Sequence, residues 1–192
     1  MATVAHLAAG ALCGAVYARK ASANSLVAVP LFAALALSPD LDFFAVQLGS
    51  DGTPFAHRAM THAIPVGAVV GMALGVGFGR SPQKLWAGLL AFLALASHGI
   101  LDAMTANAPG PWLWWPLTSA PLSFAWQPIP GTESWQEYFT LAAVPTLAVE
   151  SLLSLPLVAA AGWVLWGPLP WDGGASVDAG GPGVRRPLPS SD

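Results

Sequence analysis

The chain has 192 residues, of which 55% are hydrophobic and only 9% are charged. Soluble domains carry about a quarter charged residues, so this composition excludes an ordinary soluble domain and indicates a membrane protein that crosses the bilayer several times. A net charge of −3 without a basic stripe argues against a nucleic-acid-binding protein. The single cysteine excludes an intrachain disulfide and a cysteine-based zinc cluster.

The first apolar segment, residues 3–18, is expected to form a retained transmembrane helix. A secretory signal carries positive charge before its apolar run, whereas Arg19 and Lys20 follow the run here. Cys13 within this segment is expected to be a small apolar packing residue.

Hydropathy predicts four further spans, at residues 25–38 with a short continuation to 48, 62–79, 85–105 and 136–166. Several are shorter than the ~20 residues that a full crossing prefers, so a re-entrant or partly interfacial arrangement of the first two is an alternative. Pro145 and Pro156 are expected kink points in the last span. The expected fold is therefore an all-α membrane bundle of about five spans. It forms one domain over residues 1–166, followed by a disordered tail, 167–192, rich in Gly, Pro and Ser.

Basic residues predict the orientation of the bundle. Six of the seven fall on one side of a five-span layout: Arg19, Lys20, Arg80, Lys84, Arg185 and Arg186. The positive-inside rule makes that side cytoplasmic. We therefore expect a multi-pass protein of a bacterial plasma membrane with its N-terminus outside and its C-terminus in the cytoplasm.

Histidines and aspartates gather at the outer end of this layout. His98 and Asp102 are four residues apart in SHGILD, so they share one helix face. At about 1.5 Å per residue they lie about 20 Å and 26 Å from the cytoplasmic start of the span at Leu85, near the outer surface of a ~30 Å hydrocarbon core. The other members at this depth are His6, Asp40, Asp42, His57 and His62.

Imidazoles and carboxylates together are typical ligands of zinc, manganese or iron. The expected metal ligands are His6, Asp40, Asp42, His57, His62, His98 and Asp102. Seven ligands are too many for one tetrahedral ion and favour two divalent ions bridged by a carboxylate, with zinc as the first choice. Two such ions activate water and stabilise an in-line phosphoryl displacement. Arg58 and Asp42 are the expected catalytic residues, with the Arg58 guanidinium binding a phosphate oxygen.

Together, His6, PDLD at 39–42, HRxxTH at 57–62, SHxxxD at 97–102 and WPL at 115–117 resemble the YdjM-type inner-membrane proteins. The resemblance covers residues 1–130 and implies a membrane-bound, metal-dependent hydrolase. The HxxxD element is also similar to the metal-binding core of zinc-dependent phospholipase C. This similarity implies phosphoester hydrolysis, with His98, Asp102 and an aspartate from 40–42 on shared metals. A basic residue that usually follows WP[FL] is replaced here by Ser119, Ala120 and Pro121, a departure that concerns substrate recognition.

Several of these residues also have structural interpretations. A His98–Asp102 pair can be a packing or proton-relay element, and Asp42 can cap a helix. Arg58 can neutralise Asp40 or Asp42 instead of binding phosphate.

Other polar and aromatic residues are expected to support the site. Thr61 and Thr105 are expected to orient ligands, and Glu150 is expected to make a structural hydrogen bond rather than bind metal. The tryptophans of the outer loop, 106–134, are expected to form an interfacial aromatic belt, with a lipid-substrate platform as the alternative. They are Trp112, Trp114, Trp115 and Trp126.

The function predicted first is hydrolysis of a phosphoester, and a lipid-linked one fits because the site lies at headgroup depth. Membrane lipids are the expected partners, and nucleic acid is not. A metal or proton transporter is the alternative, but it would need polar residues across the bilayer. The spans below His98 are almost wholly apolar apart from Glu150. A membrane scaffold with a vestigial site is the third interpretation.

The orientation can be tested directly. A reporter fused after Arg186 should be cytoplasmic, and a tag at Gly131 should be labelled from outside intact cells, because the basic residues favour the cytoplasmic side. Labelling of loop 106–134 only from the cytoplasm would invert the layout.

Overall fold

A computed structural model describes residues 3–46, 48–49, 52–77, 82–131, 137 and 140–168. Regular structure in these residues is helical apart from one isolated bridge between Thr105 and Ile129, which confirms the all-α class. The long helices are α1 (Thr3–Ala21), α2 (Ser25–Leu37), α4 (Ile64–Gly77), α5 (Pro82–Ala103) and α6 (Val144–Trp166). The short elements are η1 (Ser38–Asp42), α3 (Phe43–Val46), η2 (Met60–His62) and η4 (Leu141–Ala143). Nearly all of the expected tail, 169–192, lies outside the described residues.

Three helical stretches in the described part of the chain are long and apolar enough to cross a membrane. They are Ser25–Val46, which joins α2, η1 and α3, then Pro82–Ala103 and Leu141–Trp166. A fourth stretch, Ile64–Val76, is apolar but shorter. Three of the five expected spans correspond to these stretches, and a fourth corresponds to the shorter one. The expected first span, 3–18, forms helix α1 but is not among the stretches apolar enough to cross a membrane.

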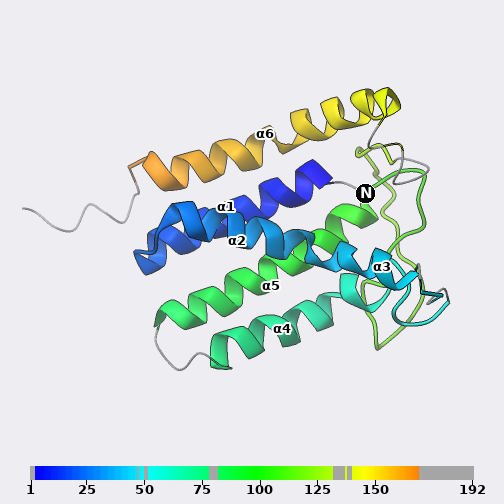
Figure 1. The fold of residues 1–192 in the computed structure, drawn as a ribbon, viewed down its shortest axis with the longest axis horizontal. Helices are drawn as coiled ribbons and strands as arrows, with labels where there is room; N and C mark the ends of the chain where they lie inside the picture. The colour runs from blue at the N-terminus through cyan, green and yellow to red at the C-terminus, as the bar shows by residue number, and fades with distance from the viewer. Residues whose placement is uncertain are drawn as a thin grey trace, which may run out of the picture.

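Helix α5 lies at the centre of the bundle. It packs against α1, α2 and α4, while α6 covers α1 (Figure 1). Because lipid tails are as apolar as leucine, helices in a membrane associate through close packing of small residues. The central cluster follows this rule, with Phe32, Ala36, Leu90, Ala91 and Ala94, and Cys13 packs against it as the expected small filler.

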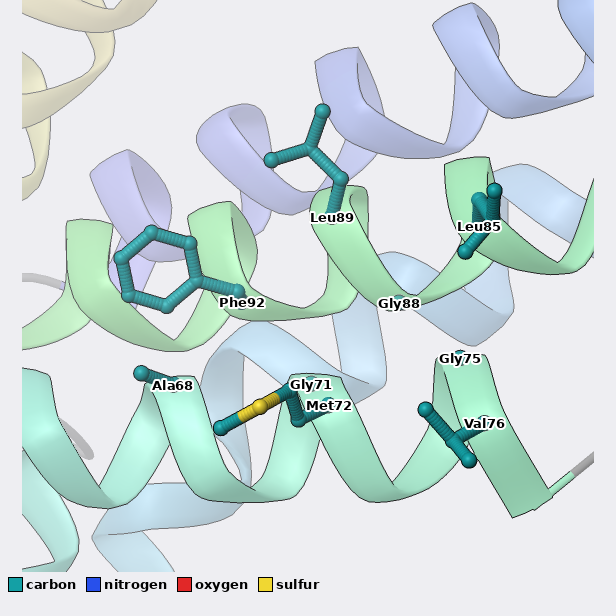
Figure 2. A pocket seen from close by; sticks show the side chains of 9 residues that line it. All are labelled: Ala68, Gly71, Met72, Gly75, Val76, Leu85, Gly88, Leu89 and Phe92. Atoms are coloured by element: carbon teal, nitrogen blue, oxygen red, sulfur yellow. The ribbon is translucent and has the colours of Figure 1, made fainter.

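The α4–α5 contact depends on glycine at one close approach. A Cβ on Gly71 would lie 2.6 Å from the carbonyl oxygen of Gly88, so the two backbones touch directly. Beside this contact runs an apolar groove of about 360 Å³, lined by side chains such as Met72, Val76 and Leu89 (Figure 2).

Two helix boundaries differ from the expected ones because of proline. α4 begins at Ile64 rather than 62, since Ala63 is extended and Pro65 fits only the first turn of a helix. Pro145 likewise lies in the first turn of α6, so it begins that helix and does not kink it; Pro156 lies inside. Because α4 begins at Ile64, His62 lies in the 3-10 turn η2 and not in the α-helix.

Arg19 and Lys20 lie at the end of the bundle opposite the histidines. Arg19 Nη1 donates to the carbonyl oxygens of Val164 and Leu165 at the C-terminal end of α6 (3.4 and 3.3 Å). The Lys20 amine lies 5.5 Å from the ring centre of Trp86, near the start of α5. Cations at a helix C-terminus interact favourably with its unpaired carbonyls.

Glu150 is fully buried in α6, where the sequence predicts a structural hydrogen bond. Its Oε2 accepts a hydrogen bond from the backbone N–H of Val4 at 3.0 Å, which confirms that expectation. A carboxylate stabilises the unpaired N–H groups in the first turn of a helix. This contact ties α6 to the start of α1, two residues before His6.

Candidate metal centre

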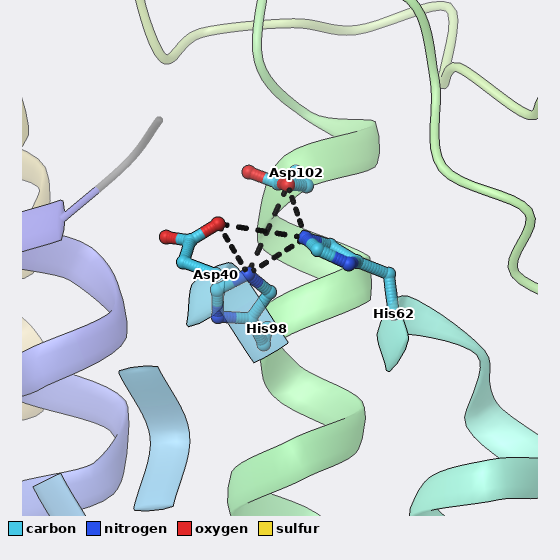
Figure 3. Close-up of side chains that lie close together, drawn as sticks. All are labelled: Asp40, His62, His98 and Asp102. Atoms are coloured by element: carbon cyan, nitrogen blue, oxygen red, sulfur yellow. Dashed lines mark hydrogen bonds and ion pairs between the residues drawn. The ribbon is translucent and has the colours of Figure 1, made fainter. Parts of the chain in front are cut away.

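Four side chains from three elements point toward one another at one end of the bundle (Figure 3). Asp40 comes from η1, His62 from η2, and His98 and Asp102 from α5. One ligand atom of each lies within 4.8 Å of the others. His62 Nε2 lies 3.2 Å from Asp102 Oδ2 and 3.6 Å from Asp40 Oδ1, and His98 Nε2 lies 3.3 Å from Asp40 Oδ1 and 3.9 Å from Asp102 Oδ2.

These separations match the dimensions of a tetrahedral site. Zinc bonds of about 2.0–2.1 Å place tetrahedral ligands roughly 3.3–3.4 Å apart. Of the distances that involve a histidine, the shortest joins the two Nε2 atoms of His62 and His98, at 3.0 Å, and the longest is the 3.9 Å between His98 Nε2 and Asp102 Oδ2. The four atoms can therefore surround one divalent ion with little movement.

Hydrogen bonds behind the two histidines define which ring nitrogens face the cluster. His98 Nδ1 lies 2.7 Å from the Ala36 carbonyl oxygen, which can only accept, so Nδ1 carries the proton. The Thr61 hydroxyl donates to Asp42 Oδ2 at 2.5 Å, so its oxygen accepts from His62 Nδ1 at 3.0 Å. In the neutral rings both Nε2 atoms then present lone pairs to each other, an arrangement that requires a cation.

Unpaired buried atoms concentrate in this same cluster. Among the described residues, the buried side-chain atoms without a hydrogen-bond partner are both ring nitrogens of His6, both oxygens of Asp40 and Oδ2 of Asp102. A buried polar atom left unpaired costs about 1–3 kcal/mol, and more when charged. His6 stacks on His98 with ring centres 3.8 Å apart, and its Nε2 lies 3.5 Å from Asp102 Oδ1. The residues present thus fit a bound metal ion.

Asp42 lies behind His62 rather than among the unpaired carboxylates. Its Oδ1 accepts from His57 Nδ1 at 2.6 Å, and its Oδ2 accepts from Thr61 and from the Arg58 backbone N–H (3.3 Å). The alternative of Asp42 as a helix cap is therefore wrong, because its oxygens bind the 57–61 segment. Carboxylates in this position orient the histidines that bind metal.

Asp42, His57 and His62 also form a second group that could hold an ion. The sequence predicts two ions bridged by a carboxylate, but the residue common to both groups is His62. The reason is that Asp42 approaches the Nδ1 side of the His62 ring, while Asp40 and Asp102 face Nε2.

Arg58 is buried, with 5% of its surface exposed, and has a left-handed backbone with φ of 67°. Its Nη2 lies 3.3 Å from Asp102 Oδ1, and its Nη1 donates to the Pro109 carbonyl at 2.7 Å. The alternative interpretation, in which the Arg58 guanidinium neutralises Asp40 or Asp42, is therefore wrong, because the guanidinium pairs with Asp102. Arg58 neutralises one oxygen of a candidate metal ligand and ties the loop that contains Pro109 to it.

The two threonines have different roles. Thr61 orients His62 through Asp42 as expected, whereas Thr105 Oγ1 donates to the Leu101 carbonyl at 3.0 Å, one turn back in the chain. The expectation that Thr105 orients a ligand is wrong, because this local bond occupies its hydroxyl group.

Two contributors were missed in the sequence. Gly99 lies against η2, where a Cβ would collide with the carbonyl oxygen of His62, so only glycine lets η2 approach α5 this closely. Its position directly after His98 was a usable signal. The Ala36 carbonyl that orients His98 left no signal, since every residue has a carbonyl group.

The electrostatics of His62 reflect an excess of negative charge. Burial alone would lower the pKa of His62, but hydrogen bonds that its ring donates to Asp102, Asp40 and Asp42 raise that pKa well above its usual range. The surrounding carboxylates thus favour a positive charge at this position, which a proton or a metal ion can supply.

The model of one protein family, described as YdjM inner membrane protein, matches residues 1–171. The chain belongs to the YdjM inner membrane protein family. The resemblance found in the motifs is thereby confirmed, and the apolar helices of this YdjM-family chain agree with insertion in the inner membrane. No curated protein and no solved structure matches the chain, and the similarity to zinc-dependent phospholipase C rests on the HxxxD spacing alone.

Removing ligands of this YdjM-family protein should remove its metal. His98→Ala and Asp102→Ala should each lose most of the bound divalent metal, measured by mass spectrometry of the purified protein, because each removes one of four donors. Thr105→Val is the matched control and should keep the metal, since its hydroxyl bonds only Leu101. Full retention of metal in the His98→Ala, Asp102→Ala double variant would contradict the site.

Proposed function

We propose that this protein is a metal-dependent hydrolase that cleaves a phosphoester at the outer face of the inner membrane. One observation carries the proposal: two imidazole nitrogens and two carboxylates face each other in a buried site, with the Asp40 and Asp102 oxygens unpaired. Asp40, His62, His98 and Asp102 would hold one divalent ion. Zinc suits this donor set best, and manganese or iron also fits.

A bound divalent ion would polarise a phosphoryl oxygen and lower the pKa of water to about 7. Asp40 has 10% of its side chain exposed and is the most accessible of the four ligands, although both of its oxygens are buried. A second ion could use the group of Asp42, His57 and His62.

Asp42 would act through His57, whose side chain is 25% exposed. The hydrogen bond from His57 Nδ1 to Asp42 leaves Nε2 as the ring atom available for proton transfer. A histidine held by a carboxylate is a common general acid or base, because the carboxylate sets its tautomer and orientation. This assigns a proton-transfer role to the His57–Asp42 pair.

A hydrolase explains the residues below the site better than a transporter does. A pathway for ions needs polar groups across the bilayer. The buried residues of α2 and α5 below His98 are apolar, including Phe32, Leu90 and Ala94. Glu150 is a buried acidic residue of α6, but its carboxylate accepts a hydrogen bond from Val4 at the start of α1.

Substitution of Arg58 tests whether phosphoester turnover depends on the bound metal. Arg58→Ala should weaken metal binding and phosphoester turnover together, by about ten- to a hundred-fold, because a charge-assisted bond to Asp102 contributes about 1.5–3 kcal/mol. Arg58→Lys should recover part of both. Metal content and hydrolysis of a chromogenic phosphoester are measured on the same preparation.

Arg19→Ala serves as the control, since Arg19 bonds α6 carbonyls at the opposite end of the bundle. Metal retained in Arg58→Ala with turnover lost would instead assign Arg58 to the substrate phosphate. If metal-loaded wild-type protein hydrolyses no phosphoester, the hydrolase proposal fails and the transporter moves ahead.

A further inference from the structure

A gap between α2 and α4 leads from the middle of the bundle to the metal centre. Both helices pack on α5 but hardly on each other, so α5 forms the floor between them. A cavity of about 510 Å³ lies in this gap, lined by residues that include Leu31, Phe32, Leu35, Leu74, Ala87 and Ala91. A second cavity of about 170 Å³ lies nearer the metal centre, lined by residues that include Leu35, Ser38, Thr61, Val66, Val70 and Leu95.

We call these two neighbouring cavities together the α2–α4 trough. Leu35 lines both of them. Along α5 the lining runs from Lys84 to Leu95, a length of roughly 16 Å at about 1.5 Å per residue. The trough thus has the shape of an extended hydrocarbon chain rather than that of a compact ligand.

The end of the trough nearest the metal centre carries the hydroxyl residues Ser38 and Thr61. Its lining there includes Pro39, which directly precedes the candidate ligand Asp40, and Thr61, which bonds Asp42 and His62. Between this end and the far end, where Tyr17 and Lys84 lie, the lining is aliphatic or aromatic. One polar end beside the metal centre and a long apolar remainder are complementary to an amphiphile with a phosphate head and a hydrocarbon tail.

The apolar groove between α4 and α5 lacks such hydroxyl groups (Figure 2). Its lining residues, which lie between Ala68 and Phe92, are all apolar, and none of them belongs to the metal centre. Bilayer lipid can fill both spaces, but of the two only the trough reaches Pro39 and Thr61, which lie next to candidate metal ligands in the sequence.

We propose that the α2–α4 trough binds the hydrocarbon chain of a membrane lipid phosphoester and places its phosphate at the metal centre. The proposal rests on the hydrolase function for the chemistry, but chain binding can be measured without turnover. The lipid enters sideways from the bilayer between α2 and α4, and Lys84 at the far end limits the length of chain that the trough accepts.

Photo-crosslinking tests chain binding directly. Full-length protein in phosphatidylethanolamine vesicles is illuminated with a palmitoyl phosphatidic acid that carries a diazirine near the end of its chain. Mass spectrometry should find the crosslinks concentrated on trough residues such as Leu31, Leu74 and Ala87. Ala87→Trp should reduce them about tenfold, since excluding even a couple of methylene groups from an apolar site weakens binding by about that factor.

Two further variants make this result specific. Val70→Trp narrows the trough from an exposed position on the opposite wall, where a tryptophan disturbs the core least, and should reduce the crosslinks similarly. Met72→Trp fills the groove of Figure 2 and should leave them unchanged. Crosslinks spread equally over trough and groove, as for ordinary annular lipid or a helix of a second copy, would overturn the proposal, as would crosslinks that survive both trough variants.

Turnover separates this proposal from the hydrolase proposal. Ala87→Trp should lower the ratio of palmitoyl to butyroyl phosphatidic acid hydrolysis about tenfold, for the reason given for binding. Crosslinks in the trough without hydrolysis of any phosphoester would support chain binding and overturn the hydrolase. Hydrolysis of a soluble phosphoester without trough crosslinks would support the hydrolase and overturn chain binding.

Discussion

In their neutral forms, His62 and His98 direct Nε2 lone pairs at each other across 3.0 Å inside the bundle, and the carboxylates of Asp40 and Asp102 lie against them. Buried carboxylates are tolerated only where positive charge and hydrogen bonds compensate them. Arg58 covers one oxygen of Asp102. The remaining oxygens need a cation at the centre of the cluster, and the surrounding structure is arranged around that need.

The histidines of the cluster are held in place by contacts outside it. The Ala36 carbonyl fixes His98, Thr61 fixes His62, and Glu150 fixes the start of the helix that carries His6. Such outer contacts set tautomers and orientations before a ligand binds. Small residues serve the same end, because Gly99 lets the His62 turn lie directly on α5. The fold and the site therefore depend on the same close packing.

Periodicity and charge predicted what depends on local geometry. The spacing of His98 and Asp102 predicted that both lie on one face of α5. The basic residues Arg19 and Lys20 predicted that the C-terminal end of α1 lies far from the histidines, so that His6, near its N-terminal end, lies beside them. Contacts made by irregular segments could not be predicted. Arg58 pairs with Asp102 because a left-handed turn directs it there, and that turn follows no repeat in the sequence.

X-ray absorption spectroscopy of the metal-loaded protein tests the central claim most directly, because it reports the donor atoms and their distances. A zinc ion at this site should show about four nitrogen and oxygen neighbours near 2.0–2.1 Å, with the outer-shell scattering of about two imidazole rings. In the fraction of zinc that His98→Ala retains, this imidazole scattering should fall by half. A spectrum with about six oxygen neighbours and no imidazole scattering would mean that the ion binds elsewhere, and would contradict the account.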